Sequence, residues 1–145
     1  MAAIDALPTE TIQLAEESLR RCAGDSFFQA FYRRLLSVDA ATREKFAQTD
    51  FSRQNKVLQH GLGLLFTYAK HGNPALLDRI AARHDQRDLD IAPSYYPHFV
   101  ESLLHTVQEF DPKFSAEVAD AWKRSMSPGI AFIAERYVAP AADGA

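Results

Sequence analysis

The sequence of 145 residues lacks the features that mark several large classes of protein. Cys22 is the one cysteine, which excludes an internal disulfide and a cluster of thiolate metal ligands. No apolar run approaches the length of a membrane span, and the first residues show no basic segment followed by an apolar one, as a secretory signal would. We therefore expect a cytoplasmic protein with no membrane partner.

A strong positive charge is also missing, because the 16 lysines and arginines are outnumbered by 19 aspartates and glutamates. The two signs are interspersed and form no basic stripe, so nucleic acid is not an expected partner. The sequence has no glycine-rich phosphate loop, no paired-histidine zinc motif and no nucleophile elbow. Hydrolase chemistry therefore has little support.

Alternation of apolar and polar residues with a period of two, which would predict strands, does not occur over any useful length. Helical periodicity is present instead, and 47% of the residues are hydrophobic, which is enough for one sizeable core. We predict an all-α fold in a single domain over 1–145, with a core at about 8–138 and a flexible C-terminal tail. The predicted helices cover about 8–23, 25–36, 39–46, 52–71, 73–84, 94–110 and 111–137.

Several expected features of these helices rest on single residues. Gly24 is predicted to end the first helix in a left-handed conformation, Ser52 to cap the fourth helix, and Asp111 to cap the seventh. Gly61 lies in the apolar stripe of the fourth helix, where we expect it to let another helix approach closely. Pro128 should bend the seventh helix without ending it, since the apolar pattern resumes in phase after it.

The fifth predicted helix carries a histidine on its apolar face. Asn73 provides a cap for this helix, and Pro74 fills its first position. The apolar face consists of Leu76, Leu77, Ile80, Ala81 and His84. A single histidine in such a place is more often a satisfied core residue than a ligand, so its interpretation depends on the rest of the chain.

Three residues on other predicted helices precede His84 in order: Tyr32, Phe46 and Gln54. Taken singly, Tyr32 is an ordinary buried aromatic and Gln54 an exposed first-turn residue. The segments around the set are FYRRLLSVDAATREKF, RQNKVL and RIAARHDQRDLDIAPSYYPHF. In this order they resemble the globin domain of bacterial flavohaemoglobins and related single-domain bacterial globins. The resemblance implies a globin fold, with about seven helices packed around a haem pocket.

The resemblance further implies haem b, iron protoporphyrin IX, as the cofactor, with His84 as the proximal ligand of the iron. Tyr32, Gln54 and Leu58 would form the distal ligand pocket. The other implied cofactor contacts are Phe46, Val57, Leu58, Leu77, Ile80, Tyr96 and Phe99. Bound oxygen carries partial negative charge, so a phenol O–H and an amide N–H can both stabilise it, while Leu58 would keep that side dry.

The other histidines are weaker candidates for iron ligands. His60 lies closer to His84 than Gln54 does, and the shorter separation leaves too little chain for the long fourth helix and its turn. We therefore expect His60 to face solvent or to pack, and His98 and His105 to lie at the surface or on the propionate side of the haem.

The sequence departs from the flavohaemoglobin pattern in three ways. The segment between Phe46 and Gln54 is slightly shorter, and Glu135 is out of register with the glutamate that joins the proximal histidine and tyrosine in that family. A strongly electron-donating histidine is therefore not implied. The sequence also contains no flavin or nicotinamide reductase region, so turnover would need a separate reductase.

We expect a globin that reversibly binds a diatomic gas: oxygen, as in oxygen transport, nitric oxide or carbon monoxide. An enzymatic alternative is nitric oxide dioxygenation, which a steady-state assay of nitric oxide consumption with a reductase would distinguish from carriage. Two further alternatives are a haem-based gas sensor or interaction module and a globin-shaped protein without haem. An absorbance spectrum of the purified protein decides the last point. The sequence leaves the oligomeric state open.

Overall fold

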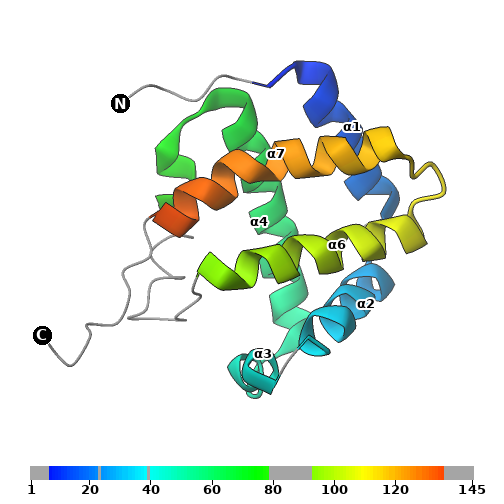
Figure 1. Ribbon diagram of the computed structural model, residues 1–145, viewed down its shortest axis with the longest axis vertical. Coiled ribbons are helices and arrows are strands. Elements are labelled where there is room, and N and C mark those ends of the chain that lie inside the picture. Colours follow the sequence, from blue (N-terminus) through cyan, green and yellow to red (C-terminus); the bar gives the residue numbers. More distant parts are fainter. Residues whose placement is uncertain (1–6, 23, 39, 79–92, 136–145) are drawn as a thin grey trace, which may run out of the picture.

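The computed structural model describes residues 7–22, 24–38, 40–78 and 93–135 (Figure 1). These residues form six α-helices and two short 3-10 helices and contain no strand, which confirms the all-α prediction. The elements are α1 (Thr9–Cys22), α2 (Asp25–Leu36), α3 (Ala40–Lys45), α4 (Phe51–His71), η1 (Pro74–Leu76), η2 (Pro93–Tyr95), α6 (Tyr96–Phe110) and α7 (Ala116–Glu135). None of these helices has the length and the apolar character needed to cross a membrane.

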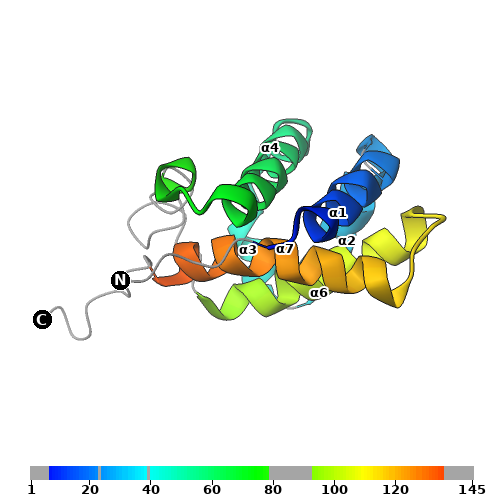
Figure 2. The same ribbon diagram turned by 90° about the horizontal axis from the view of Figure 1, so that it is seen from above.

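The helices pack in two layers (Figures 1 and 2). One layer contains α1, α2 and α4, while α6 and α7 lie side by side in the other. The main contacts between the layers join α7 to α4 and α1, and α6 to α2. The largest fully buried side chains include Trp122, Phe27, Phe31, Phe66, Leu103 and Met126. The bulkiest part of the core therefore comes from aromatic side chains of α2 and α4 and from Trp122 of α7.

The ends of α4 show how the local sequence sets this helix. Asp50, and not Ser52, is its cap, because the Asp50 carboxylate accepts hydrogen bonds from the amides of Ser52 at 3.1 Å and Arg53 at 3.4 Å. The helix therefore begins at Phe51. At its other end Gly72 has a φ of 66°, the left-handed conformation that glycine adopts without strain, so the predicted end is confirmed. Asn73 then caps η1 by accepting a hydrogen bond from Ala75 N, as predicted.

Two other predicted helix ends are wrong. Gly24 has a φ of 167°, which is extended backbone, and it serves as the first flanking residue of α2. Asp111 does not cap α7, because Ser115 Oγ accepts the hydrogen bond from Val118 N at 3.1 Å and α7 begins only at Ala116. Pro128 lies inside α7, which continues to Glu135, so the proline does not end the helix, as predicted.

The helical glycine that allows a close approach is Gly129 on α7, and not Gly61 as predicted. A Cβ added to Gly129 would lie 2.5 Å from Leu65 Cδ2 and 3.3 Å from Leu77 Cδ1. A Cβ added to Gly61 would meet no atom of the described residues within 4 Å. Gly129 therefore allows Leu65 of α4 and Leu77, which follows η1, to pack closely on α7, while a side chain at Gly61 would have no such neighbour in the described part of the chain.

Asp111 instead links α1 to the turn between α6 and α7. Its buried carboxylate accepts hydrogen bonds from Ser18 Oγ at 2.6 Å, Arg21 Nε at 2.6 Å and Lys113 N at 2.9 Å. Burial alone would raise the pKa of this carboxyl group, but the hydrogen bonds from Arg21 and Ser18 outweigh it and lower the pKa to about 2. The ionised form of Asp111 is therefore part of the folded structure.

Candidate functional site

Three aromatic rings surround Tyr32, whose side chain lies in α2. Its ring centroid is 4.9 Å from that of Phe31, 5.1 Å from that of Phe51 and 5.8 Å from that of Phe46. Phe46 directly follows α3, and Phe51 is the first residue of α4. Three consecutive helices therefore meet around one phenol, and Tyr32 is left only 5% exposed.

The side chains of Tyr32 and Gln54 lie close enough for Gln54 to influence the Tyr32 hydroxyl group, so the structure brings the predicted distal pair together. Burial raises the pKa of Tyr32 to about 12, while the nearby Gln54 side chain acts in the opposite direction. The phenol therefore keeps its proton at neutral pH and can donate a hydrogen bond. Gln54 is half-buried, so its amide lies at the edge of the core.

Phe51 belongs to this cluster, although the sequence analysis did not select it. Its ring stacks on that of Phe46, with the two centroids 6.1 Å apart. The sequence pattern that could have identified Phe51 is an aromatic residue that directly follows a capping aspartate and lies one helical turn before Gln54. Placing the cap at Ser52 put Phe51 outside the helix and hid this relationship.

One face of α4 beside the pair is apolar and open. Leu58 is 9% exposed, as expected for a residue that closes the pocket, but Val57 is 54% exposed. Gln54, Val57 and Gly61 follow one another at helical spacing, so they share this face. Since Gly61 also meets open space among the described residues, this face has room for a flat apolar group.

The predicted contacts on the other elements lie close to the core. Leu77, which follows η1, is fully buried, and Tyr96 is 9% exposed at the start of α6. Burial raises the pKa of Tyr96, so its hydroxyl group also stays protonated. Phe99 is half-buried and packs edge-on against Phe31, with centroids 5.4 Å apart, which connects α6 to the aromatic cluster around Tyr32.

The remaining predicted site residues, Ile80 and His84, lie outside the described residues, and their roles stay predictions. Within the described ranges there is no group of three or more histidine, cysteine, aspartate or glutamate side chains that could hold a metal ion. Haem iron needs only one or two axial protein ligands, so a haem site does not depend on such a group.

The globin family model matches residues 29–131, which is most of the chain. This chain belongs to the globin family. A solved structure similar to this globin comes from Pseudomonas aeruginosa PAO1 and is described as structurally highly homologous to a human haemoglobin. The two chains are 35% identical, the match covers 89% of this chain and 99% of the other, and the TM-score is 0.85. No curated protein matches the sequence.

Family membership confirms the predicted globin fold and indicates that the protein binds haem, the cofactor that globins hold through a proximal histidine. The described residues fit such a group, because α4 offers an open apolar face at Val57 and Gly61 next to two polar side chains, Tyr32 and Gln54. A particular similarity to flavohaemoglobins stays a prediction.

The other histidines of this globin occupy the periphery of its described part. His60 is exposed on α4, and His105 is exposed on α6, where its Nε2 lies 3.9 Å from Glu101 Oε1. His98 is half-buried near the start of α6. Glu135, the last residue of α7, is exposed. The exposure of His60 agrees with the expectation that it faces solvent or packs at the surface.

Proposed function

We propose that this globin binds haem b through His84 and reversibly binds oxygen or another diatomic gas on the opposite face of the haem. The observation that carries the proposal is the placement of the buried Tyr32 next to Gln54, within an aromatic cluster beside the open face of α4. Haem iron, when present, supplies the position at which the gas is held.

The chain's own residues would hold the haem by apolar contact and by close fit. Val57 and Leu58 would cover one face from α4, and Phe46 would wedge against the edge of the porphyrin. The other proposed contacts are Leu77, Ile80, Tyr96 and Phe99. The exposed surface of Val57 supports this assignment, because a large apolar side chain gains free energy when a ligand removes it from water.

Tyr32 and Gln54 would provide the polar side of the pocket. Oxygen becomes partly anionic when it binds in such a site, whereas carbon monoxide gathers much less charge, so donors favour oxygen. The Tyr32 phenol is protonated and points into the cluster with Gln54, and the amide of Gln54 supplies a second donor. Buried Leu58, one helical turn after Gln54, would exclude water.

The proposal is tested by the absorbance spectrum of the purified protein and of two variants. The parent should show the spectrum of a haem protein, with shifts when oxygen or carbon monoxide is added to the reduced form. His84→Ala should lose haem or hold it weakly, and its stability should fall because a bound cofactor favours the folded state. His60→Ala is the matched control and should keep the parent spectrum. An unchanged spectrum in His84→Ala would rule out the proposed ligand.

The same polar pocket suits nitric oxide dioxygenation, with a separate reductase supplying electrons. A steady-state assay of nitric oxide consumption, run with and without an added reductase and its nicotinamide donor, distinguishes this activity from reversible binding. Sustained consumption that depends on the reductase and falls in Tyr32→Phe would identify the chain as the enzyme. Consumption that stops after one turnover per haem would identify a carrier.

A further inference from the structure

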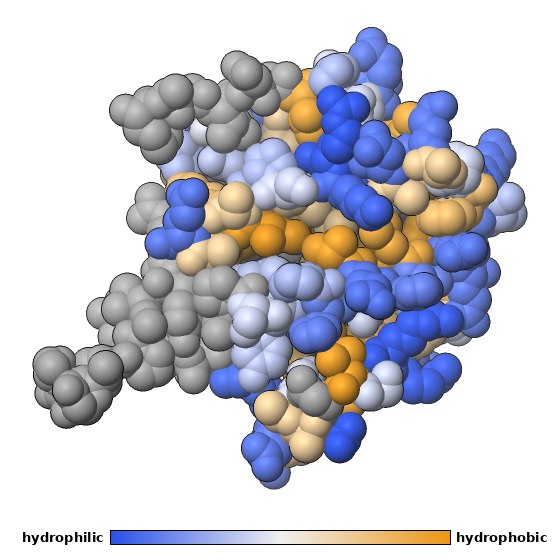
Figure 3. Space-filling model, viewed as in Figure 1, coloured by the Kyte–Doolittle hydropathy of each residue, from blue (hydrophilic) through white to orange (hydrophobic). Residues whose placement is uncertain are grey.

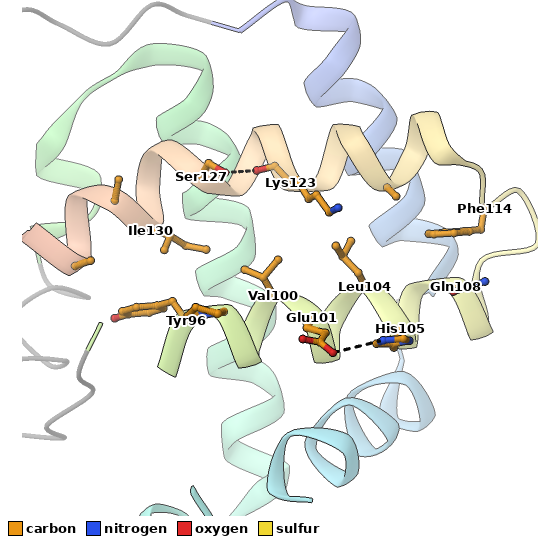
Figure 4. A pocket seen from close by; sticks show the side chains of 14 residues that line it. Tyr96, Val100, Glu101, Leu104, His105, Gln108, Phe114, Lys123, Ser127 and Ile130 are labelled. Carbon is orange, nitrogen blue, oxygen red and sulfur yellow. Dashed lines mark hydrogen bonds and ion pairs between the residues drawn. The ribbon is translucent and has the colours of Figure 1, made fainter. Parts of the chain in front are cut away.

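The start of α6 borders a groove of about 790 Å³ that runs between α6 and α7 (Figure 4). Tyr96 lines one end of this groove, and Val100, Leu104 and Ile130 extend toward its space. Figure 3 shows a hydrophobic band that crosses the surface here between more hydrophilic rims. Because the groove separates the two helices, α7 does not pack closely on the start of α6, and other elements must hold it.

The helix α3 is also thinly held. It has six residues, of which only Thr42 is buried, and it packs mainly on α2. A short element with little buried surface opens more easily than the long helices that form the core. Phe46, a proposed haem contact, directly follows α3, so its position depends on how this helix is held.

A surface contact between Lys45 and Tyr95 joins these two segments. Lys45 is the last residue of α3, and its Nζ lies over the ring of Tyr95 in η2, 5.7 Å from the ring centroid. This distance is within the range of a cation–π interaction, in which the cation is attracted to the face of the ring. Each partner is directly followed along the chain by a proposed haem contact, Phe46 in one case and Tyr96 in the other. The surface contact therefore helps to fix the separation of two residues that would hold the haem.

The same two segments are also connected through the aromatic core. Three ring-to-ring contacts lead from Phe46 through Tyr32 and Phe31 to Phe99 of α6, with centroids between 4.9 and 5.8 Å apart. The two central rings are at most 5% exposed, so water does not reach them. In the surface contact, by comparison, the lysine is exposed and the tyrosine is half-buried. The surface contact is therefore the link between α3 and α6 that can open while the core stays intact.

We propose that Lys45 and Tyr95 are positioning residues for the haem site, and that their contact slows the exchange of haem by holding the end of α3 against the start of α6. When this contact opens, α3 can shift on α2 and carry Phe46 with it, while Tyr96 stays on α6. Phe46 then no longer packs against the edge of the porphyrin. The inference rests on the proposed haem function and adds a pair of residues that act through their chain neighbours.

The rate at which ferric haem passes from the full chain to an excess of a haem-free acceptor protein, followed by absorbance, tests the proposal. Lys45→Met keeps an apolar stem but removes the cation, and Tyr95→Leu removes the ring. Each should speed haem loss by about two- to fivefold, as expected for an exposed cation–π contact. The double variant should lose haem no faster than the faster single variant, because either substitution alone already breaks the contact.

Conservative variants separate the contact from general effects of substitution. Lys45→Arg keeps a cation and Tyr95→Phe keeps the ring, so both should retain the parent rate of haem loss. Lys123→Met is the matched control. It makes the same change at an exposed lysine of α7 that lies over no ring in the described part of the chain, and it should also keep the parent rate.

Hydrogen exchange of the haem-free chain follows the contact without the cofactor. Amides of α3 should exchange about two- to fivefold faster in Lys45→Met and in Tyr95→Leu, while amides in the C-terminal half of α4 should keep the parent rate. A parent that binds no haem would overturn the proposed function and this inference together. A parent that binds haem, with single variants at the parent rate of haem loss, additive effects in the double variant or parent-like exchange in α3, would overturn the positioning role alone.

Discussion

The C-terminal half of α4 is packed into the core, whereas its N-terminal half is partly open. Leu62, Phe66 and Ala69 are at most 1% exposed, but Val57 is 54% exposed and Gln54 is half-buried. Both halves belong to one continuous helix, so the difference comes from their neighbours. α7 and α1 cover the C-terminal half, while the described part of the chain leaves Val57 uncovered.

This contrast separates the residues that stabilise the fold from those that we propose to bind ligands. In the packed half, the buried side chains gain their free energy from burial in the haem-free chain. In the open half, Val57 can gain such free energy only from a bound group. Substitutions in the two halves should therefore affect different measurements, the free energy of unfolding in one case and the affinity for haem in the other.

The largest effect is expected in the packed half. Phe66 is 1% exposed and packs edge-on against Trp122, with centroids 5.5 Å apart, so Phe66→Ala should lower the free energy of unfolding by about 3–5 kcal/mol. Val57→Ala should change it by less than about 0.5 kcal/mol in the haem-free protein, because the side chain is already in water. Urea unfolding of the haem-free chains measures both values.

The same two variants should reverse their order in a haem-transfer experiment. Val57→Ala should release haem to an excess of a competing acceptor faster than the parent does. If Val57→Ala left the rate of haem loss unchanged, the open face of α4 would not be a haem contact.

Asp111 belongs with the packed part of the molecule and gives that part a pH dependence. Its pKa is lowered from an ordinary value of 3.8 to about 2, so the unfolded chain binds more protons between these values. Stability should therefore fall as the pH drops from about 4 to about 2, by about 2 kcal/mol for this group. Urea midpoints measured across this range should show the loss in the parent and much less of it in Asp111→Asn. Asp120→Asn, at a largely exposed side chain, is the control and should keep the parent profile.

The sequence predicted those parts of the fold that depend on residues close together along the chain. The helix types and the end of α4 at Gly72 follow from periodicity and caps, whereas the placement of Tyr32 beside Gln54 was implied by the resemblance to bacterial globins. Asp111 was misassigned because an aspartate before a proline resembles a helix cap. Its actual partner, Arg21, lies 90 residues away, and no local pattern indicates such a contact.

The missed and misplaced residues have a similar cause. Gly61 and Gly129 both lie in helices, and only the packing of α4 against α7 decides which of them needs the absence of a side chain. Phe51 was missed because a shift of the cap by two residues, from Asp50 to Ser52, removed it from the helix. A small error in a boundary therefore changed which aromatic residues were assigned to the site.

At the polar pocket beside the open half of α4, the expected effect is on the rate of oxygen dissociation. A hydrogen bond to a partly charged acceptor is worth about 1–3 kcal/mol, so Tyr32→Phe should speed oxygen dissociation by about tenfold or more. Carbon monoxide dissociation should change much less, and this ligand serves as the internal control. Gln54→Leu should act in the same direction but more weakly, because a longer side chain loses more rotamer freedom when it is held in place. Stopped-flow measurements that gave parent-like oxygen rates in both single variants and in the double variant would exclude the polar pocket.

The smallest effect compares one substitution at two helical glycines. Gly63 is exposed on α4 and a Cβ there meets no described atom within 4 Å, so Gly63→Ala should stabilise the protein by up to about 1 kcal/mol through helix propensity. Gly129→Ala has the same propensity gain, but its Cβ would lie 2.5 Å from Leu65 Cδ2, and displacing a packed core side chain costs about 1–3 kcal/mol. Gly129→Ala should therefore be no more stable than the parent, and less stable than Gly63→Ala. Equal gains at both positions, measured by thermal or urea unfolding, would show that the core around Leu65 adapts freely to an added methyl group.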